Sequence, residues 1–147
     1  MKKFFDYLGL LLELEIEEGE VVYTDIRFVP DLNEDDFEKI SYEKLLNFRI
    51  DLTRFSDFEK NVLKKVREIP SGKAMTYKDV AEAAGYNGAS RAVGNVMAKN
   101  PFPVLVPCHR VIKSDRSLGD YSRGGKKMKK SLLELEGMDF EGDKLKL

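Results

Sequence analysis

Apolar and acidic residues alternate near the start of the chain. In residues 8–17 the apolar side chains that follow Leu11 occupy every second position, and glutamates fill the positions between them. A period of two predicts a strand with one buried face. Residues 21–29 also have the composition of a strand, and the Glu-Gly-Glu run between the two segments is typical of a turn. We therefore expect a β-hairpin that ends at Pro30.

A helical period replaces the alternation in residues 34–48. The apolar residues lie near helical spacing, and the acidic residues at the start of the segment suit a helix N-terminus because of the helix dipole. The apolar positions are Phe37, Ile40, Leu45 and Phe48. We predict a helix over this range, which would complete a small α/β unit with the hairpin. No residue pattern in this unit indicates chemistry.

A further amphipathic helix is predicted after Ser56. Ser56 and Glu59 have the spacing of a capping box, in which each residue satisfies a backbone N–H at the helix start. An apolar stripe follows at helical spacing, and a Pro-Ser-Gly run at 70–72 ends the helix. The stripe consists of Phe55, Phe58, Val62, Leu63, Val66 and Ile69.

Two short helices are predicted next, joined by a tight turn that contains glycine. Thr76 is a suitable N-cap for the first helix and Gly85 a suitable residue after its end. The second helix covers residues 89–99, and the Asn-Pro pair at 100–101 ends it. This arrangement is typical of a helix-turn-helix, although many such pairs are only packing units, and the pattern alone leaves both interpretations open.

The remainder of the chain contains one apolar segment, two loops and one more helix. We expect residues 102–106 to be extended, with residues 111–112 continuing beyond a Pro-Cys-His-Arg run. A polar loop at 113–119 and a glycine-rich bend at 120–125 follow, and residues 126–136 form a final helix closed by Gly137.

Charge is distributed unevenly between the two halves of the sequence. Residues 1–53 carry 6 basic and 14 acidic side chains, whereas residues 54–147 carry 19 and 12, so the net charges are −8 and +7. This division predicts two domains with these bounds, the second of which faces a polyanion. A chance distribution of solvated charge is the alternative.

Cysteine and histidine each occur once in the 147 residues. One cysteine cannot form an internal disulfide, and one cysteine with one histidine cannot supply a four-ligand zinc site. The first residues resemble a signal peptide in having two lysines before apolar positions, but glutamates interrupt the apolar run. No stretch approaches the roughly 18 apolar residues of a membrane span. We expect a soluble cytoplasmic protein with no metal.

The single cysteine and the single histidine are adjacent, as Cys108 and His109. A thiolate is a strong nucleophile, and a histidine within hydrogen-bond reach could accept the thiol proton. Neighbours in a strand point to opposite faces, so a contact would need a turn at Cys108 or a bridging water. The alternative is an inert core thiol beside a satisfied buried imidazole.

These residues belong to a longer set of motifs. From about Phe55 to Gly137 the chain resembles the O6-alkylguanine-DNA alkyltransferases, also called methylated-DNA–protein-cysteine methyltransferases. The motifs are IPSGKAMTY, SRAVGNVMAKNP, PCHRVI, GDYSRGG and LLELEG, in this order. The resemblance implies a small N-terminal ribonuclease-H-like α/β domain and a mostly helical C-terminal winged helix-turn-helix domain. It also implies a monomer that binds double-stranded DNA through the minor groove.

The resemblance implies a reaction as well. Cys108 would attack the alkyl carbon on O6 of a damaged guanine, with O4-alkylthymine as a second substrate. No cofactor takes part, and each molecule reacts once because nothing removes the alkyl group from sulfur. His109 would deprotonate the thiol through a water, Glu136 would orient His109, and Tyr77 would donate a proton towards guanine N3.

The resemblance also assigns residues that bind the substrate. Arg91 would enter the base stack in place of the flipped guanine, and Asn100 would brace the active-site loop. The carbonyls of Cys108 and Val111 would accept the guanine amino group, and Tyr121 and Ser122 would line its O6 side. The full set of substrate- and DNA-binding residues is Arg91, Asn100, Met97, Val111, Tyr121, Ser122, Gly119 and Arg110.

Two other classes of function compete with this one. A helix-turn-helix protein could mark lesions without chemistry, but family members of that kind lack the cysteine. A Cys-His hydrolase would need an oxyanion hole and usually a histidine distant in sequence, and no pattern here indicates either.

Overall fold

The first 27 residues form a three-stranded antiparallel sheet in a computed structural model that describes residues 1–33 and 35–146. The strands follow chain order and are β1 (Lys2–Tyr7), β2 (Leu10–Glu17) and β3 (Glu20–Arg27). The predicted hairpin is confirmed as β2 and β3, and Leu12 and Leu14 point into the core without exposure. Strand β1 was not predicted, because its adjacent apolar residues Phe4 and Phe5 do not alternate with polar ones.

The predicted helix over 34–48 is wrong. Among the described residues of that range only α1 (Tyr42–Leu45) is helical, with Ser41 as its N-cap. The backbone before it pairs with the edge of β1 instead, since the Asp6 N–H donates to the Glu38 carbonyl at 2.8 Å. An unpaired strand edge offers hydrogen bonds that compete with those of a helix. Local spacing alone could not reveal this competition.

The helices after residue 55 match the predicted ones. They are α2 (Asp57–Arg67), α3 (Tyr77–Ala83) and α4 (Ser90–Ala98). Ser56 and Glu59 form the predicted capping box of α2, and Thr76 forms another with Asp79 at α3. Gly85 follows α3 with φ of 90°, a left-handed conformation in which glycine is unstrained.

Residues 102–106 form a buried turn, so the prediction of an extended segment is wrong. The Asn100 side chain organises the turn, because its Nδ2 donates to the Val106 carbonyl and its Oδ1 accepts from the Phe102 N–H, each at 2.9 Å. Val104 lies at φ 73°, which is unusual for a β-branched residue. The 3₁₀ helix η1 (Cys108–Arg110) follows the turn.

The remaining elements complete the C-terminal part. Strand β5 (Val111–Ile112) pairs in parallel with β4 (Met75–Thr76), which directly precedes α3. Helix α5 (Gly125–Leu135) has Glu136 as its C-cap, and Gly137 follows at φ 93°. A short hairpin of β6 (Phe140–Glu141) and β7 (Lys144–Leu145) ends the described chain.

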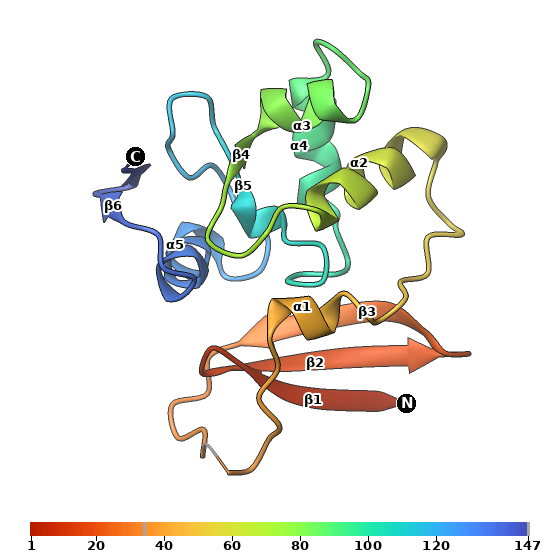
Figure 1. Ribbon diagram of the computed structural model, residues 1–147, viewed down its shortest axis with the longest axis vertical. Coiled ribbons are helices and arrows are strands. Elements are labelled where there is room, and N and C mark those ends of the chain that lie inside the picture. The colour runs from red at the N-terminus through yellow and green to blue at the C-terminus, as the bar shows by residue number, and fades with distance from the viewer. Residues whose placement is uncertain (34, 147) are drawn as a thin grey trace.

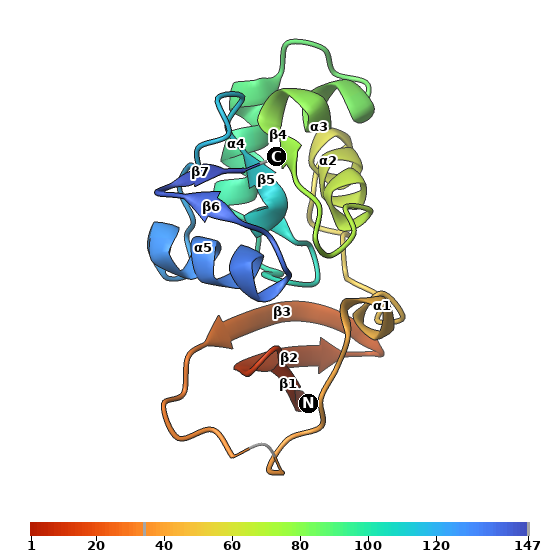
Figure 2. The ribbon, with the colours of Figure 1, turned by 60° about the vertical axis from the view of Figure 1, so that its left-hand side comes forward.

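The sheet and α1 lie at one end of the molecule, and the helices from α2 to α5 lie at the other (Figures 1 and 2). One mixed α/β core joins the two ends, with buried apolar residues contributed from both. Backbone and side-chain hydrogen bonds also cross between them, as where Arg67 donates to the carbonyls of Leu45 and Phe48. Within the described ranges no helix is long and apolar enough to cross a membrane.

Candidate active site

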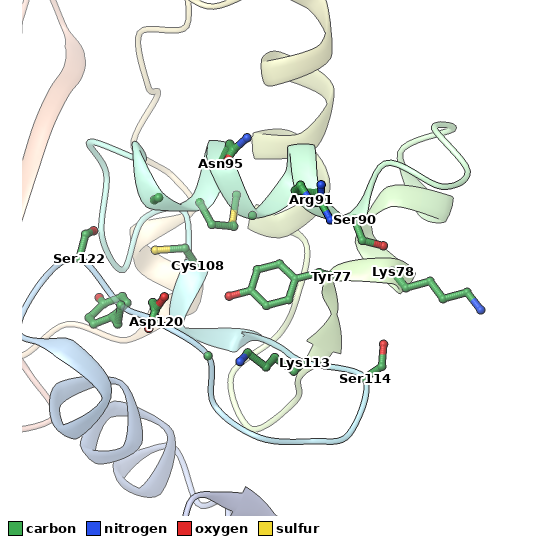
Figure 3. A pocket seen from close by; sticks show the side chains of 15 residues that line it. Tyr77, Lys78, Ser90, Arg91, Asn95, Cys108, Lys113, Ser114, Asp120 and Ser122 are labelled. Carbon is green, nitrogen blue, oxygen red and sulfur yellow. The ribbon is translucent and has the colours of Figure 1, made fainter.

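A pocket lies between α3, α4, the loop after β5 and the glycine-rich bend. Figure 3 shows the Cys108 side chain and the Tyr77 ring facing the same space, with Arg91 on α4 at its rim. Most of the residues that the resemblance assigned to substrate come together here. Those that line the pocket are Tyr77, Arg91, Met97, Cys108, Gly119, Tyr121 and Ser122.

Cys108 occupies the first position of η1 and is 5% exposed. Its backbone N–H donates to the Val106 carbonyl at 2.7 Å, so the thiol is held by the turn that Asn100 organises. Burial raises the pKa of the Cys108 thiol, and a hydrogen bond with the Asn100 side chain and the charge of Lys129 oppose that rise. A thiol of this kind needs a base to become a nucleophile.

His109 follows Cys108 in η1 and is completely buried. Its Nε2 lies 3.1 Å from both carboxylate oxygens of Glu136. A carboxylate only accepts hydrogen bonds, so Nε2 carries the proton between them. The other ring nitrogen, Nδ1, makes no hydrogen bond with the described residues. Burial lowers the pKa of His109 and outweighs the opposing effect of Glu136. The lowered pKa keeps the imidazole neutral, so Nδ1 is available as an acceptor.

Glu136 is the most heavily bonded group of the site. Burial raises the pKa of Glu136, but hydrogen bonds from His109 and Arg110 outweigh burial and lower it to about 2. The carboxylate is therefore ionised at neutral pH. A histidine held by an ionised carboxylate on one nitrogen and free on the other has the geometry of a general base.

Arg110 was predicted to bind substrate or DNA, but its side chain is not among those that line the pocket. The side chain is fully buried and contributes to the core behind the pocket. Its Nε and Nη2 donate to the two oxygens of Glu136 at 3.0 and 2.6 Å, and its Nη1 donates to the Ile69 carbonyl at 2.6 Å. Its guanidinium also lies 4.0 Å from the centre of the Tyr42 ring. The positive charge counted in the sequence is thus neutralised inside the protein.

Tyr77 lies at the start of α3 and reaches across the pocket. Burial, followed by the negative charges of Cys108 and Asp120 in their ionised forms, raises the pKa of Tyr77 to about 12. The phenol is therefore protonated at neutral pH and available as a donor. Gly119 allows this approach, since a Cβ added there would lie 3.1 Å from the Tyr77 hydroxyl.

Two other predicted residues have different surroundings. Asn100 is buried and braces the turn at 102–106, as the geometry given above shows. Val111 is buried beside the pocket, and its carbonyl already accepts a hydrogen bond of 2.7 Å from Lys129 Nζ. A carbonyl has a second lone pair, so this bond leaves one position for another donor.

Two residues near the site were not predicted as parts of it. The side chain of Lys129 is buried, and burial lowers its pKa to about 8. Its spacing of three and four residues from Leu132 and Leu133 indicates the buried face and could have revealed this. Tyr7 donates to Glu136 at 2.6 Å from a strand 129 residues away, and no local signal could have revealed that contact.

Comparison with known proteins gives this arrangement a family. Residues 57–138 match the family model described as 6-O-methylguanine DNA methyltransferase, DNA binding domain. The chain belongs to this family. A curated family member, the methylated-DNA–protein-cysteine methyltransferase of Methanothermobacter thermautotrophicus, is 44% identical over 93 residues, which are 63% of this chain and 51% of that protein. The chain spans about half the length of the curated relatives it matches.

Solved structures of the family have the same fold. Mycobacterium tuberculosis OGT in complex with DNA is 27% identical, covers 92% of this chain and 91% of its own, and has a TM-score of 0.68. Schizosaccharomyces pombe Atl1, in complex with damaged DNA containing O6-carboxymethylguanine, is 34% identical over 65% of this chain and 92% of its own, with a TM-score of 0.55. The family therefore includes proteins that were crystallised on DNA.

Proposed function

We propose that this protein repairs DNA by transferring the alkyl group from O6 of guanine to the sulfur of its own Cys108. O4-alkylthymine is a second candidate substrate. One observation carries the proposal: the only cysteine of the chain lines a pocket with the His109–Glu136 pair behind it, within the segment that matches the family model. Atl1 was crystallised with DNA that contains O6-carboxymethylguanine, and this supports an O6-alkylguanine as the ligand.

The side chains account for each step of this transfer. His109 Nδ1 accepts the thiol proton through a water, while Glu136 stabilises the imidazolium that forms. The Cys108 sulfur then forms a bond to the alkyl carbon as the bond from that carbon to O6 breaks. The electron pair passes into the guanine ring, where the protonated Tyr77 phenol donates to N3. The product is an S-alkylcysteine, so each protein molecule acts once and no cofactor is consumed.

The pocket rim supports DNA as the substrate. Lys78, Arg91 and Lys113 are exposed basic residues at the pocket, where they would meet phosphates or the gap left by a flipped base. In this proposal α3 and α4 form the helix-turn-helix of a winged domain and enter the minor groove. Arg91 takes the place of the extruded guanine.

The broader organisation is proposed with the same function. We assign residues 1–53 to a ribonuclease-H-like α/β domain and residues 54–147 to the DNA-binding and alkyl-acceptor domain. The protein would act as a monomer in the cytoplasm.

The test is transfer from duplex DNA carrying radiolabelled O6-methylguanine. We expect label on Cys108, with at most one label per protein, from the reduced protein without additions. Cys108→Ser should bind the DNA and acquire no label. Multiple turnovers, or binding by the reduced wild-type protein without transfer, would refute the proposal, and the second outcome would instead indicate a protein that marks lesions.

The proposed role of Arg91 gives a separate prediction. Arg91→Ala should slow transfer from duplex DNA by at least about tenfold and leave the reaction with free O6-benzylguanine nearly unchanged, because the free base needs no extrusion. Arg49→Ala is a suitable control, since Arg49 is an exposed arginine of the N-terminal part. Equal slowing of both reactions would contradict a role in base flipping.

A further inference from the structure

The N-terminal sheet contributes one side chain to the group that orients His109. Tyr7, the last residue of β1, is 1% exposed, and its hydroxyl donates to Glu136 Oε2 at 2.6 Å. The two residues are separated by 129 positions in the chain. Their contact joins β1 to the end of α5, so the carboxylate of the site depends on both parts of the molecule.

Both oxygens of the Glu136 carboxylate are occupied. His109 Nε2 approaches both of them, Arg110 donates to each, and Tyr7 donates to Oε2. A carboxylate offers about four lone-pair positions, so these donors leave little freedom to rotate. Arg110 also donates to the Tyr7 oxygen at 3.3 Å, which turns the phenol proton towards Glu136.

We propose that Tyr7 is a positioning residue for the alkyl transfer, whose phenol fixes the plane of the Glu136 carboxylate and thereby sets the orientation and basicity of His109. This inference rests on the proposed function and adds a role for the N-terminal part. Tyr7 acts through Glu136 and does not itself touch the pocket.

The electrostatics give the effect a sign. The hydrogen bond from Tyr7 partly neutralises the negative charge of Glu136. It therefore weakens the electrostatic attraction by which this carboxylate stabilises a protonated His109. Burial, and then the charge of Glu136, raise the pKa of Tyr7, so the phenol remains a neutral donor. Other titratable groups also face the His109–Glu136 pair from the elements packed around it. They are Cys108 and Arg110 on η1, Tyr42 on α1, Lys129 on α5 and Tyr121 in the glycine-rich bend.

Removal of the phenol should therefore have two consequences. The carboxylate regains charge, so the pKa of His109 should rise. The carboxylate also regains freedom to rotate, so the imidazole is held less well for proton transfer. A purely structural link between the two parts of the molecule would change stability without either effect.

The experiment compares Tyr7→Phe with Tyr42→Phe. Tyr42 is also buried, its hydroxyl donates to the Arg67 carbonyl at 2.6 Å, and phenylalanine keeps the ring over Arg110. Each variant thus loses one donated hydrogen bond of the same length, but only Tyr7→Phe loses a donor to Glu136, and with it the acceptor of the 3.3 Å bond from Arg110. Because His109 is the only histidine, the single imidazole signal in NMR spectra reports its protonation directly.

We expect the imidazole of Tyr7→Phe to titrate at higher pH than that of the wild-type protein. The acidic limb of the single-turnover transfer rate should move in the same direction, and the rate at neutral pH should fall about tenfold. Tyr42→Phe should retain the wild-type profile. A 3-fluorotyrosine at position 7 keeps the ring and donates a stronger hydrogen bond. It should therefore lower the pH at which the imidazole of His109 titrates.

Imidazole spectra of Tyr7→Phe that match the wild type across the pH series would overturn the inference, and so would a superimposable pH–rate profile. The NMR comparison needs no substrate. If the wild-type protein failed to transfer label, the proposed function would fall, while the spectra would still decide whether Tyr7 sets the basicity of His109.

Discussion

Replacement of Glu136 by glutamine tests how much the buried carboxylate contributes to stability. The side chains of Glu136, His109 and Arg110 have no exposure, and the change removes the negative charge while nearly preserving shape. The amide also presents donor hydrogens where Arg110 and His109 already donate. Removing one partner of a buried ion pair typically costs about 3–5 kcal/mol, because the other charge remains buried.

The lowered pKa of Glu136 gives a second estimate of how much the carboxylate contributes to the free energy of unfolding. A change from the ordinary value of 4.5 to about 2 corresponds to about 3 kcal/mol of stability at neutral pH. Because the folded-state pKa is the lower one, this contribution is complete above about pH 4.5 and is lost as the pH falls towards 2. The two routes agree on a loss of about 3 kcal/mol or slightly more.

The assay is urea unfolding of the wild type, Glu136→Gln and Glu134→Gln at several pH values between 2 and 7. Glu134 lies on the same helix and is exposed, so it provides the matched control. We expect Glu136→Gln to be about 3 kcal/mol less stable than the control at pH 7, and the difference to shrink as the pH falls below about 4. A difference below about 1 kcal/mol at pH 7, or one that is independent of pH, would refute the reasoning.

Two further substitutions test the residues that shape the pocket. Asn100→Ala leaves the buried Phe102 N–H without its acceptor and removes one of the two donors to the Val106 carbonyl. Unfolding in urea should therefore show a loss of about 1–3 kcal/mol and label transfer should fall, whereas Asn61→Ala at an exposed site should do neither. Gly119→Ala places a Cβ 3.1 Å from the Tyr77 hydroxyl at a residue with φ of 74°, so it should reduce transfer. Gly142 has a similar φ of 61° but lies in open space. Gly142→Ala should therefore cost similar backbone strain, about 1 kcal/mol, and leave transfer normal.

The parts of the fold that were predicted correctly are those with local causes. The capping box at Ser56 and the N-cap at Thr76 depend only on residues within one helical turn, so the local sequence was sufficient to predict them. The hairpin of β2 and β3 was likewise evident from alternation over neighbouring residues. The helix predicted over 34–48 failed because β1 offered its edge to the same backbone.

The candidate site divides in a similar way. Cys108 and His109 drew attention because each is unique in the chain, and the motifs around them implied the remaining residues of the pocket. The motifs indicated nothing about burial, so Arg110 was assigned to substrate or DNA binding, although its side chain pairs with a carboxylate 26 residues later. Tyr7 was missed because its contact with Glu136 depends on how the whole chain folds.

Thr24 in β3 limits how freely this protein could be divided or recombined. Its N–H donates to the Pro101 carbonyl at 3.0 Å, and its hydroxyl donates to the Pro103 carbonyl at 2.7 Å. A fragment starting at residue 54 would keep the whole pocket lining, but both carbonyls would lose the Thr24 donors and Glu136 would lose the Tyr7 donor. Another domain fused in place of residues 1–53 would need hydrogen-bond donors to the same two carbonyls and to the Glu136 carboxylate. Within the first 53 residues, Thr24 and Tyr7 are therefore constrained by the turn and by the carboxylate that they support.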